Sequence, residues 1–204
     1  MFKDREEAGR ALSCLLKKIN IDTKNAVVLA LPRGGVPVAY SIKKMLNIPM
    51  DVVVSKKIGA PYNPEYAIAA MSEWGDVEIN VYEEYNRNYI EQQKKEIEKK
   101  IEEYIQKYRQ GRKLPSVKGK EVILVDDGIA TGLTMLCIIN SLKKRKPKRI
   151  IVAVPVAPPE VVEKFEKIAE IVVVEKPDFF MAIGSFYEDF HQLTDEEVIE
   201  YLNA

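Results

Sequence analysis

Residues 122–135, with the sequence VILVDDGIATGLTM, decide the fold of this 204-residue chain. An apolar run rich in β-branched residues ends in two adjacent carboxylates, Asp126 and Asp127, and a short loop of small residues leads into a helical pattern near Thr134. A buried strand that passes through a loop into a helix is the repeating unit of α/β proteins with a mostly parallel sheet. Amides at the start of such a helix can bind a phosphate, and paired carboxylates can accept hydrogen bonds from vicinal hydroxyls. The segment therefore predicts a pocket for a phosphorylated sugar.

The same segment has a simpler interpretation, in which an aspartate only caps the helix. Strand–loop–helix junctions rich in glycine and threonine are common in doubly wound α/β proteins, and Asp is a frequent N-cap. Two neighbouring carboxylates beside a phosphate-binding loop would, however, repel an anion unless hydroxyls or a cation lay between them. We therefore favour the binding interpretation over plain capping.

The rest of the chain fits a single α/β domain over residues 1–204. Apolar runs of strand length alternate with amphipathic helical patterns, which indicates right-handed crossovers and a mostly parallel, twisted sheet flanked by helices. The predicted strands are residues 26–31, 51–55, 121–126, 149–155 and 171–175, with a β-ribbon made of 67–72 and 77–81. The predicted helices are residues 2–19, 37–46, 132–146, 159–168 and 195–202. Thr194 and Glu197 predict a capping box at the start of the last helix.

A long helical excursion departs from this alternation. Residues 83–112 are rich in Lys, Glu, Gln and Tyr and predict a helix that forms an insertion or cap. Its apolar positions form a narrow stripe, made of Ile90, Ile97, Ile101, Ile105 and Tyr108. A stripe this narrow suits a helix that packs over the body of the domain or against a partner, rather than one in the centre of a core. Residues 176–204 are expected to form a small C-terminal hood.

Composition excludes several classes of protein. Lys plus Arg and Asp plus Glu both total 31, so the net charge is zero and offers no global field for nucleic acid. Cys14 and Cys137 lie in helical apolar patterns and are expected to be buried, with no disulfide and no metal site. The charged N-terminal sequence does not resemble a secretory signal, and no apolar run approaches the length of a membrane span. We therefore expect a cytoplasmic protein without membrane or nucleic-acid partners.

Two further strand ends carry residues suited to anion binding. One strand leads into Arg33, Gly34 and Gly35, where glycines allow close backbone approach and the guanidinium fits phosphate oxygens. The next leads into Lys57, and residues 60–64 have the composition of a loop. Because ligands of open parallel sheets bind beyond the carboxyl ends of the strands, we expect these residues to converge with the acidic pair.

The segment around the acidic pair resembles the PRPP-binding signature of type I phosphoribosyltransferases, a hydrophobic strand followed by two acidic residues and a Thr-Gly loop. The resemblance implies that the loop binds the 5′-phosphate of PRPP and that Asp126 and Asp127 hold the ribose 2′- and 3′-hydroxyls. The loop residues implied in substrate binding are Gly128, Ile129, Ala130, Thr131, Gly132, Leu133 and Thr134. Members that act on 6-oxopurines carry an Asp at the position of Ala130, so hypoxanthine and guanine are less expected acceptors.

The same resemblance assigns roles to the other two strand ends. It implies that the glycine loop at Arg33 binds pyrophosphate, that Lys57 meets it from the next strand, and that residues 58–65 belong to a mobile lid. Glu65 is a candidate substrate-binding residue and proton carrier. The predicted catalytic residues are Asp126, Asp127, Arg33 and Lys57.

Shorter motifs extend the resemblance across most of the chain. Residues 2–9, 57–65, 108–112 and 187–190 are similar to a subgroup of uncharacterised bacterial and archaeal phosphoribosyltransferases. Asp4 and Arg5 are expected to form a structural ion pair. Tyr187 and Phe190 are expected in the core rather than stacked on a base, and His191 is expected to be a surface or hydrogen-bonded residue.

The function implied by this resemblance is transfer of a 5-phosphoribosyl group from PRPP to a nitrogenous base, with release of pyrophosphate. Mg²⁺ is the implied cofactor, held through PRPP and not by direct protein ligands, with Asp126 or Asp127 reached through water. A homodimer is expected from the striped helix and from the family.

The main alternative is a non-catalytic regulator that binds PRPP or nucleotides, for which the basic residues 143–146 would supply a local patch. A PRPP-forming pyrophosphokinase and a hydrolase on the same scaffold are further alternatives.

Overall fold

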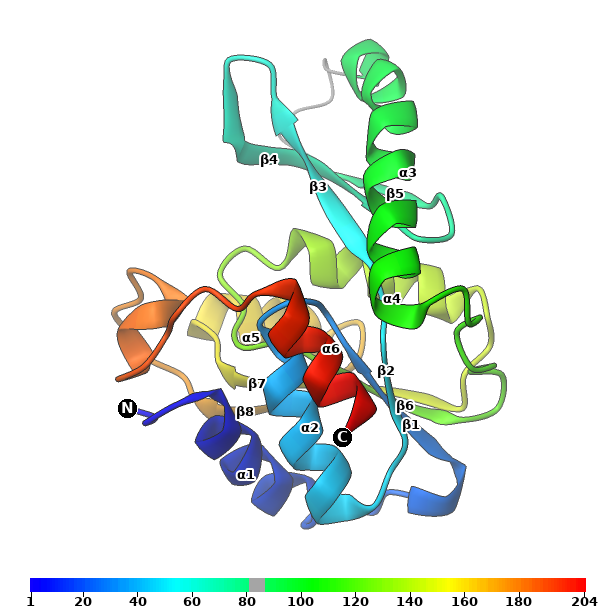
Figure 1. Ribbon diagram of the computed structural model, residues 1–204. Coiled ribbons are helices and arrows are strands. Elements are labelled where there is room, and N and C mark those ends of the chain that lie inside the picture. Colours follow the sequence, from blue (N-terminus) through cyan, green and yellow to red (C-terminus); the bar gives the residue numbers. More distant parts are fainter. Residues whose placement is uncertain (81–86) are drawn as a thin grey trace.

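A five-stranded parallel sheet forms the centre of the molecule, of which this computed structural model describes residues 1–80 and 87–204 (Figure 1). The strands are β1 (Ala26–Ala30), β2 (Met50–Val52), β6 (Glu121–Val125), β7 (Arg149–Val156) and β8 (Glu170–Glu175). Their order is β2-β1-β6-β7-β8, and every neighbouring pair is parallel. The predicted fold class is confirmed, and each predicted strand of this sheet is present.

Helices cover both faces of the sheet, which is why its strands are continuous apolar runs. One face packs against α1 (Arg5–Leu16), α2 (Gly35–Leu46) and α6 (Asp195–Asn203), and the other against α4 (Leu133–Lys143) and α5 (Pro159–Glu166). Side chains of β6 alternate between the two cores, with Ile123 and Val125 on the first face and Val122 and Leu124 on the second. Short 3-10 helices, η1 (Thr23–Asn25) and η3 (Ile183–Phe186), connect the larger elements.

The helix ends differ slightly from the predicted ones. The first helix begins at Arg5 and not at Phe2, because the Asp4 carboxylate caps it by accepting the Glu7 N–H at 2.7 Å. Phe2 instead forms a parallel β-bridge with Tyr187 of the hood. In the last helix, the capping box of Thr194 and Glu197 is confirmed.

A second, antiparallel sheet replaces a predicted loop. Its strands are β3 (Ser55–Ala60), β4 (Asn63–Ser72) and β5 (Val77–Ile79), in the order β3-β4-β5. The loop predicted over residues 60–64 is therefore too long, since only residues 61–62 form a turn and the residues on either side form a β-hairpin. Gly59 allows close packing in the hairpin: a Cβ on Gly59 would lie 2.1 Å from the Pro64 carbonyl oxygen.

The long helix α3 (Arg87–Arg109) lies across this small sheet, and we call the two together the arm (Figure 1). Ile90, Ile97 and Ile101 of the predicted stripe pack into a core of their own with β3 and β4. The interpretation that the helix packs over its own domain is thus correct. Residues 81–86, which include the predicted start of this helix, lie outside the described residues. No helix of the described ranges combines the length and apolar character that crossing a membrane requires.

Candidate functional site

The acidic pair lies where β6 ends, at the carboxyl edge of the parallel sheet. Asp127 is buried with 8% of its surface exposed, whereas Asp126 is half-buried. The Asp127 N–H donates to Asp126 Oδ1 at 2.9 Å, and Tyr187 Oη donates to the Asp127 carbonyl oxygen at 2.6 Å. The pair is therefore fixed both by its own backbone and by the C-terminal hood.

Arg5 is a part of this site that sequence reasoning missed. Its Nε donates to Asp127 Oδ2 at 2.9 Å, its Nη1 donates to the His191 carbonyl oxygen at 3.0 Å, and its guanidinium carbon lies 3.9 Å from the centre of the Phe190 ring. The predicted ion pair between Asp4 and Arg5 is wrong, because Asp4 is the cap of α1. The motif at residues 2–9 draws attention to Arg5. No feature of the neighbouring sequence, however, identifies its partner as an acid 122 positions away.

The two carboxyls differ in their electrostatic surroundings. Burial raises the pKa of Asp126 well above its ordinary value, and the neighbouring charge of Asp127 raises it further. Burial also raises the pKa of Asp127, but the Arg5 guanidinium acts in the opposite direction. The negative charge of the pair is therefore best stabilised on Asp127, and Asp126 is the more readily protonated carboxyl.

The loop that follows the acidic pair presents backbone donors at the start of α4. Within the described ranges, no backbone carbonyl pairs with the amides of residues 130–134, as expected for the first turn of a helix. Ile129 is different, because its N–H donates to the Val156 carbonyl oxygen at 2.9 Å. Ala130 and Thr131 are exposed, so the free amides are accessible to an anion.

Two glycines of this loop are required by its packing. Gly132 has a φ of 76°, and a Cβ there would lie 2.6 Å from the Phe165 ring of α5. A Cβ on Gly128 would lie 2.7 Å from Ile183 of the hood. The loop is thus held closely between α5 and the hood.

The glycine loop after β1 packs directly on the acidic pair. A Cβ on Gly34 would lie 2.0 Å from Asp127 Oδ2, and one on Gly35 would lie 2.6 Å from the Val125 carbonyl oxygen. The Gly35 N–H donates to the Leu31 carbonyl oxygen at 3.0 Å, which leaves the amides of Arg33 and Gly34 without a backbone acceptor among the described residues. The Pro32–Arg33 peptide is cis. The Arg33 side chain is partly exposed and forms no ion pair with the described part of the chain.

Lys57 and Glu65 lie on the arm and pair with each other. Lys57 Nζ is 2.7 Å from Glu65 Oε2, with 46% and 88% of the two side chains exposed. Among the hydrogen bonds and ion pairs of residues 1–80 and 87–204, none joins this hairpin pair to Asp126 or Arg33. The structure therefore brings three of the four predicted catalytic residues together and places Lys57 on a separate element.

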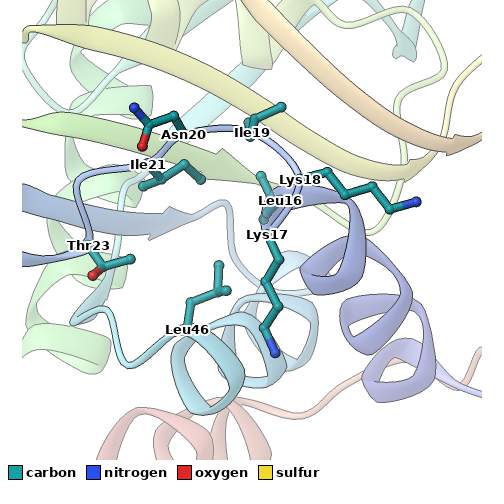
Figure 2. A pocket seen from close by; sticks show the side chains of 8 residues that line it. All are labelled: Leu16, Lys17, Lys18, Ile19, Asn20, Ile21, Thr23 and Leu46. Carbon is teal, nitrogen blue, oxygen red and sulfur yellow. The ribbon is translucent and has the colours of Figure 1, made fainter.

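A surface pocket lies away from the acidic pair. The pocket in Figure 2, of about 450 Å³, lies beside the C-terminal ends of α1 and α2, near the amino end of β1. Its lining consists of Leu16, Lys17, Lys18, Ile19, Asn20, Ile21, Thr23 and Leu46. It lacks carboxylates and lies at the edge of the sheet opposite to the candidate site.

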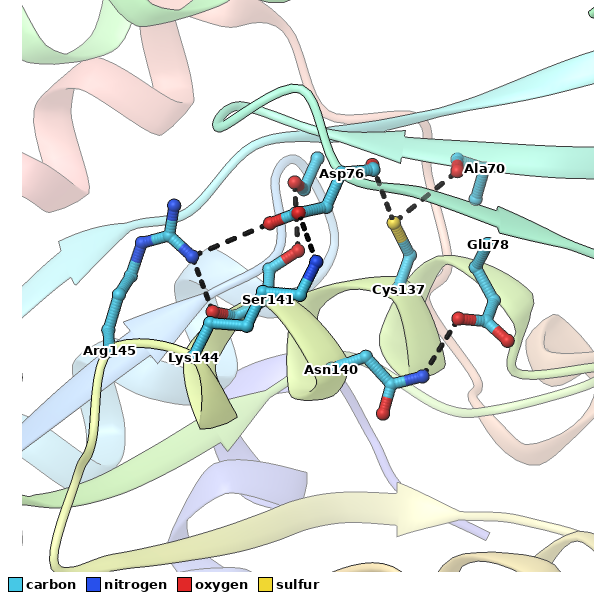
Figure 3. Close-up of polar contacts among 9 residues, drawn as sticks. Ala70, Asp76, Glu78, Cys137, Asn140, Ser141, Lys144 and Arg145 are labelled. Atoms are coloured by element: carbon cyan, nitrogen blue, oxygen red, sulfur yellow. Dashed lines mark hydrogen bonds and ion pairs between the residues drawn. The ribbon is translucent and has the colours of Figure 1, made fainter.

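The far end of α4 is attached to the arm by polar contacts (Figure 3). Lys144 Nζ lies 2.5 Å from Asp76 Oδ1, and Arg145 Nη1 lies 3.5 Å from Asp76 Oδ2. Asn140 Nδ2 donates to Glu78 Oε2 at 2.8 Å. Two of the four cations in residues 143–146 are thus paired within the chain, which weakens the interpretation of these residues as a nucleic-acid patch.

Parallel sheet, acidic pair and amide-lined loop together define an α/β protein with a polar candidate site at the carboxyl edge of its sheet, and comparison with known proteins specifies the family. The phosphoribosyl transferase domain model matches residues 1–191. The chain belongs to the phosphoribosyl transferase family.

Relatives of similar sequence and structure agree with this assignment. Two proteins of Mycobacterium tuberculosis, from strains CDC 1551 / Oshkosh and H37Rv and each named "Putative phosphoribosyl transferase", are 35% identical over 210 residues, which cover 100% of this chain and 46% of each relative. The chain therefore spans about half the length of these curated relatives. The crystal structure of the protein TT1426 from Thermus thermophilus is 38% identical with a TM-score of 0.85, covering 98% of this chain and 97% of that one. A uracil phosphoribosyltransferase of Mycoplasma genitalium is 42% identical over 57 residues, 28% of each chain.

Proposed function

We propose that this protein transfers a 5-phosphoribosyl group from PRPP to a nitrogenous base and releases pyrophosphate. The observation that carries the proposal is the convergence of three features at one edge of the sheet: the acidic pair, the free amides of residues 130–134 and the glycine loop at Arg33. Each feature matches a different part of PRPP, namely the ribose hydroxyls, the 5′-phosphate and the pyrophosphate.

The 5′-phosphate is assigned to the loop before α4. The free amides there point from the positive end of a helix, where an anion is stabilised by the helix dipole and by direct hydrogen bonds. The hydroxyls of Thr131 and Thr134 add donors. Since the Ile129 amide already donates to Val156, only the amides of residues 130–134 are assigned to the phosphate.

The ribose and the pyrophosphate are assigned to the two neighbouring loops. Asp126 would accept hydrogen bonds from ribose hydroxyls, and Arg33, with the amides of Arg33 and Gly34, would stabilise the charge that develops on the departing pyrophosphate. Lys57 and Glu65 would join only if the hairpin of the arm closed over this edge. The exposed side chains of Phe179 and Met181 in the hood offer an apolar surface for the acceptor base.

Mg²⁺ fits the site as a partner of PRPP and not as a resident ion. No three His, Cys, Asp or Glu side chains of the described residues lie close enough together to hold a metal. Carboxylate and phosphate oxygens are the ligands that Mg²⁺ prefers, and the ion keeps several waters. When bound, it would neutralise charge on the pyrophosphate, with Asp126 reached through water.

The proposal is tested by PRPP binding and turnover in the Asp126→Asn, Asp127→Asn double variant. Binding is measured by calorimetry with Mg²⁺, and turnover by pyrophosphate release in a screen of nucleobases. We expect a loss of about a hundredfold or more in turnover, as for removal of other preorganised polar contacts. Asp178→Asn, an exposed change in the hood, is the control and should leave both unchanged. Survival of binding and turnover in the double variant would refute the ribose assignment.

A further inference from the structure

Arg5 joins three parts of the molecule at the acidic pair. It lies at the start of α1, is 7% exposed, and contacts the Asp127 carboxylate, the His191 carbonyl oxygen and the Phe190 ring. Both side chains of its ion pair with Asp127 are about nine-tenths buried. A guanidinium can make these contacts at once because its donors form a rigid planar fork with an apolar face.

The segment that carries Arg5 is itself fixed to the hood. The Phe2 N–H donates to the Phe186 carbonyl oxygen at 2.7 Å, and the Phe2 carbonyl oxygen accepts the Glu188 N–H at 2.8 Å. The Lys3 carbonyl oxygen accepts the Asp189 N–H at 2.9 Å. The N-terminal segment that carries Arg5 is thus hydrogen-bonded to the C-terminal hood, and Arg5 does not move freely as a surface cation would.

The partner of Arg5 is the carboxylate against which the glycine loop packs. Asp127 Oδ2 receives the Arg5 Nε–H and also lies under the Cα of Gly34. Asp127 therefore has one oxygen committed inside the protein, and its position determines where the loop that carries Arg33 lies. Asp126 has no cation partner among the described residues and is the more exposed of the two acids.

We propose that Arg5 is a positioning residue for phosphoribosyl transfer, which holds Asp127 under Gly34 so that the pyrophosphate loop is in place and Asp126 alone meets the ribose. This assignment rests on the proposed function. It divides the acidic pair into a ligand-binding carboxylate and a carboxylate that organises the site. Arg5 acts only through Asp127 and does not touch the substrate.

The electrostatics of the site agree with this division. The groups that face Asp127 are Arg5 from α1, Asp126 from its own loop and Tyr187 from the hood. Arg5 is the cation that opposes the effect of burial on the pKa of Asp127. Arg5 lowers the pKa of both carboxyls, so without it the acidic pair should be protonated at higher pH, and PRPP binding should be lost at higher pH with it.

The experiment measures the Kd of PRPP with Mg²⁺ by calorimetry between pH 6 and 9 (about the range in which such a shift is visible). Arg5→Met should weaken PRPP binding by about tenfold or more at neutral pH. It should also shift the loss of binding on acidification to higher pH. Arg10→Met is the matched control, because Arg10 lies on the same helix, is exposed, and among the described residues has only Glu6 at 3.7 Å as its ionic partner. It should leave the Kd and its pH dependence unchanged.

A double-mutant cycle separates positioning from general damage. If Arg5 acts through Asp127, Arg5→Met should add little to the loss already caused by Asp127→Asn. Additive losses, or a folded Arg5→Met protein with the wild-type Kd and pH profile, would overturn the inference. Should Arg5→Met fail to fold, Arg5→Lys provides the test. This variant keeps the positive charge but loses the planar guanidinium. We therefore expect PRPP binding to weaken about threefold or more, while the pH at which binding is lost stays as in the wild type. A wild-type Kd in Arg5→Lys would refute the positioning role. Failure of the wild-type protein to bind PRPP would refute the proposed function instead.

Discussion

Gly34 lies where the backbone of one loop meets the side chain of another. Any Cβ at this position would lie far inside the contact distance of Asp127 Oδ2, and Asp127 cannot move away freely because Arg5 holds it. The glycine is therefore needed for packing, since its φ of −60° is open to every residue. Its role differs from that of Gly132, whose φ is positive.

We predict that Gly34→Ala weakens PRPP binding by about tenfold or more and destabilises the protein by about 1–3 kcal/mol, because the loop must shift to admit a methyl group. Gly75→Ala is the control: it also adds a methyl group, and its positive φ of 81° carries a backbone cost, but no atom of residues 1–80 and 87–204 lies within 4 Å of the added atom. It should lower stability without changing the Kd. Equal effects of the two variants on the Kd would contradict this account.

His191 gives the stability of the hood a dependence on pH. Its ring contacts Asp189 Oδ1 at 3.0 Å and Glu197 Oε1 at 3.1 Å, and these hydrogen bonds raise its pKa above the ordinary value of 6.5. A raised pKa in the folded state adds stability below the unfolded pKa, and this stability is lost as the pH rises through the folded value.

The Tm of the wild type should therefore exceed that of His191→Gln most clearly near about pH 5.5, and the difference should shrink as the pH rises above about 8. The effect should be small, because both partners are exposed to solvent. Thermal unfolding of the two proteins across this range provides the measurement. A difference that grew with increasing pH would have the wrong sign for this mechanism.

At the scale of residues, the sequence predicts those parts of the candidate site that lie together at the end of one strand. The acidic pair, the loop at residues 130–134 and the glycine loop at Arg33 each follow one strand, so their chemistry is visible in a short window. The Arg5–Asp127 pair is not visible, because its members lie 122 positions apart and the fold alone brings them together. The same is true of the Ile129 amide, whose acceptor is the carbonyl oxygen of Val156 on another strand.

At the scale of elements, a buried ion pair joins the two parts of the arm, α3 and the small sheet. Arg109 Nη2 of α3 lies 2.7 Å from Glu73 Oε1, with 3% and 5% of the side chains exposed, and Glu73 Oε2 accepts the Val54 N–H at 2.9 Å. The Arg109 Nε has no hydrogen-bond partner among the described residues. The pair thus fixes the C-terminal end of α3 to the turn after β4, and the Glu73 carboxylate links this turn to Val54, between β2 and β3.

Breaking this pair on one side should be costly. We predict that Arg109→Met lowers the free energy of unfolding by about 3–5 kcal/mol, because Glu73 would be left as a buried charge without its cation. Lys100→Met removes an exposed pair with Glu96 on the same helix and should cost less than about 1 kcal/mol. Urea denaturation of both variants is the measurement, and similar losses in the two would rule out the proposed attachment.

The elements that were predicted least well are those of the arm. The central strands and their helices have long, unambiguous apolar patterns, and all were predicted with small errors at their ends. The loop predicted over residues 60–64 was too long because proline usually indicates a loop, whereas contacts with α3 and within the β3–β4 pair stabilise a hairpin there. Those contacts are tertiary and leave no local signal.

At the scale of the whole molecule, contacts join the two ends of the chain to each other and join the arm to the last helix. The N-terminal segment pairs with the hood, and Tyr108 at the end of α3 donates to Asp195 at the start of α6 at 2.5 Å. The apolar stripe of α3 is already covered by its own hairpin, so it no longer supports a partner surface. The homodimer stays a prediction, and its interface would have to use other residues.

The contact between α4 and the arm contains a thiol whose reactivity reports on it. The Cys137 sulfur donates to the carbonyl oxygens of Ala70 and Asp76, each at 3.4 Å, and burial raises the pKa of this thiol to about 12 (Figure 3). Cys14, expected to be buried, is instead exposed on α1. An alkylating reagent should therefore label Cys14 rapidly and Cys137 only when the arm separates from α4. Mass spectrometry of the labelling time course would then measure how often the arm opens, and equal labelling rates at the two cysteines would show that this contact does not persist in solution.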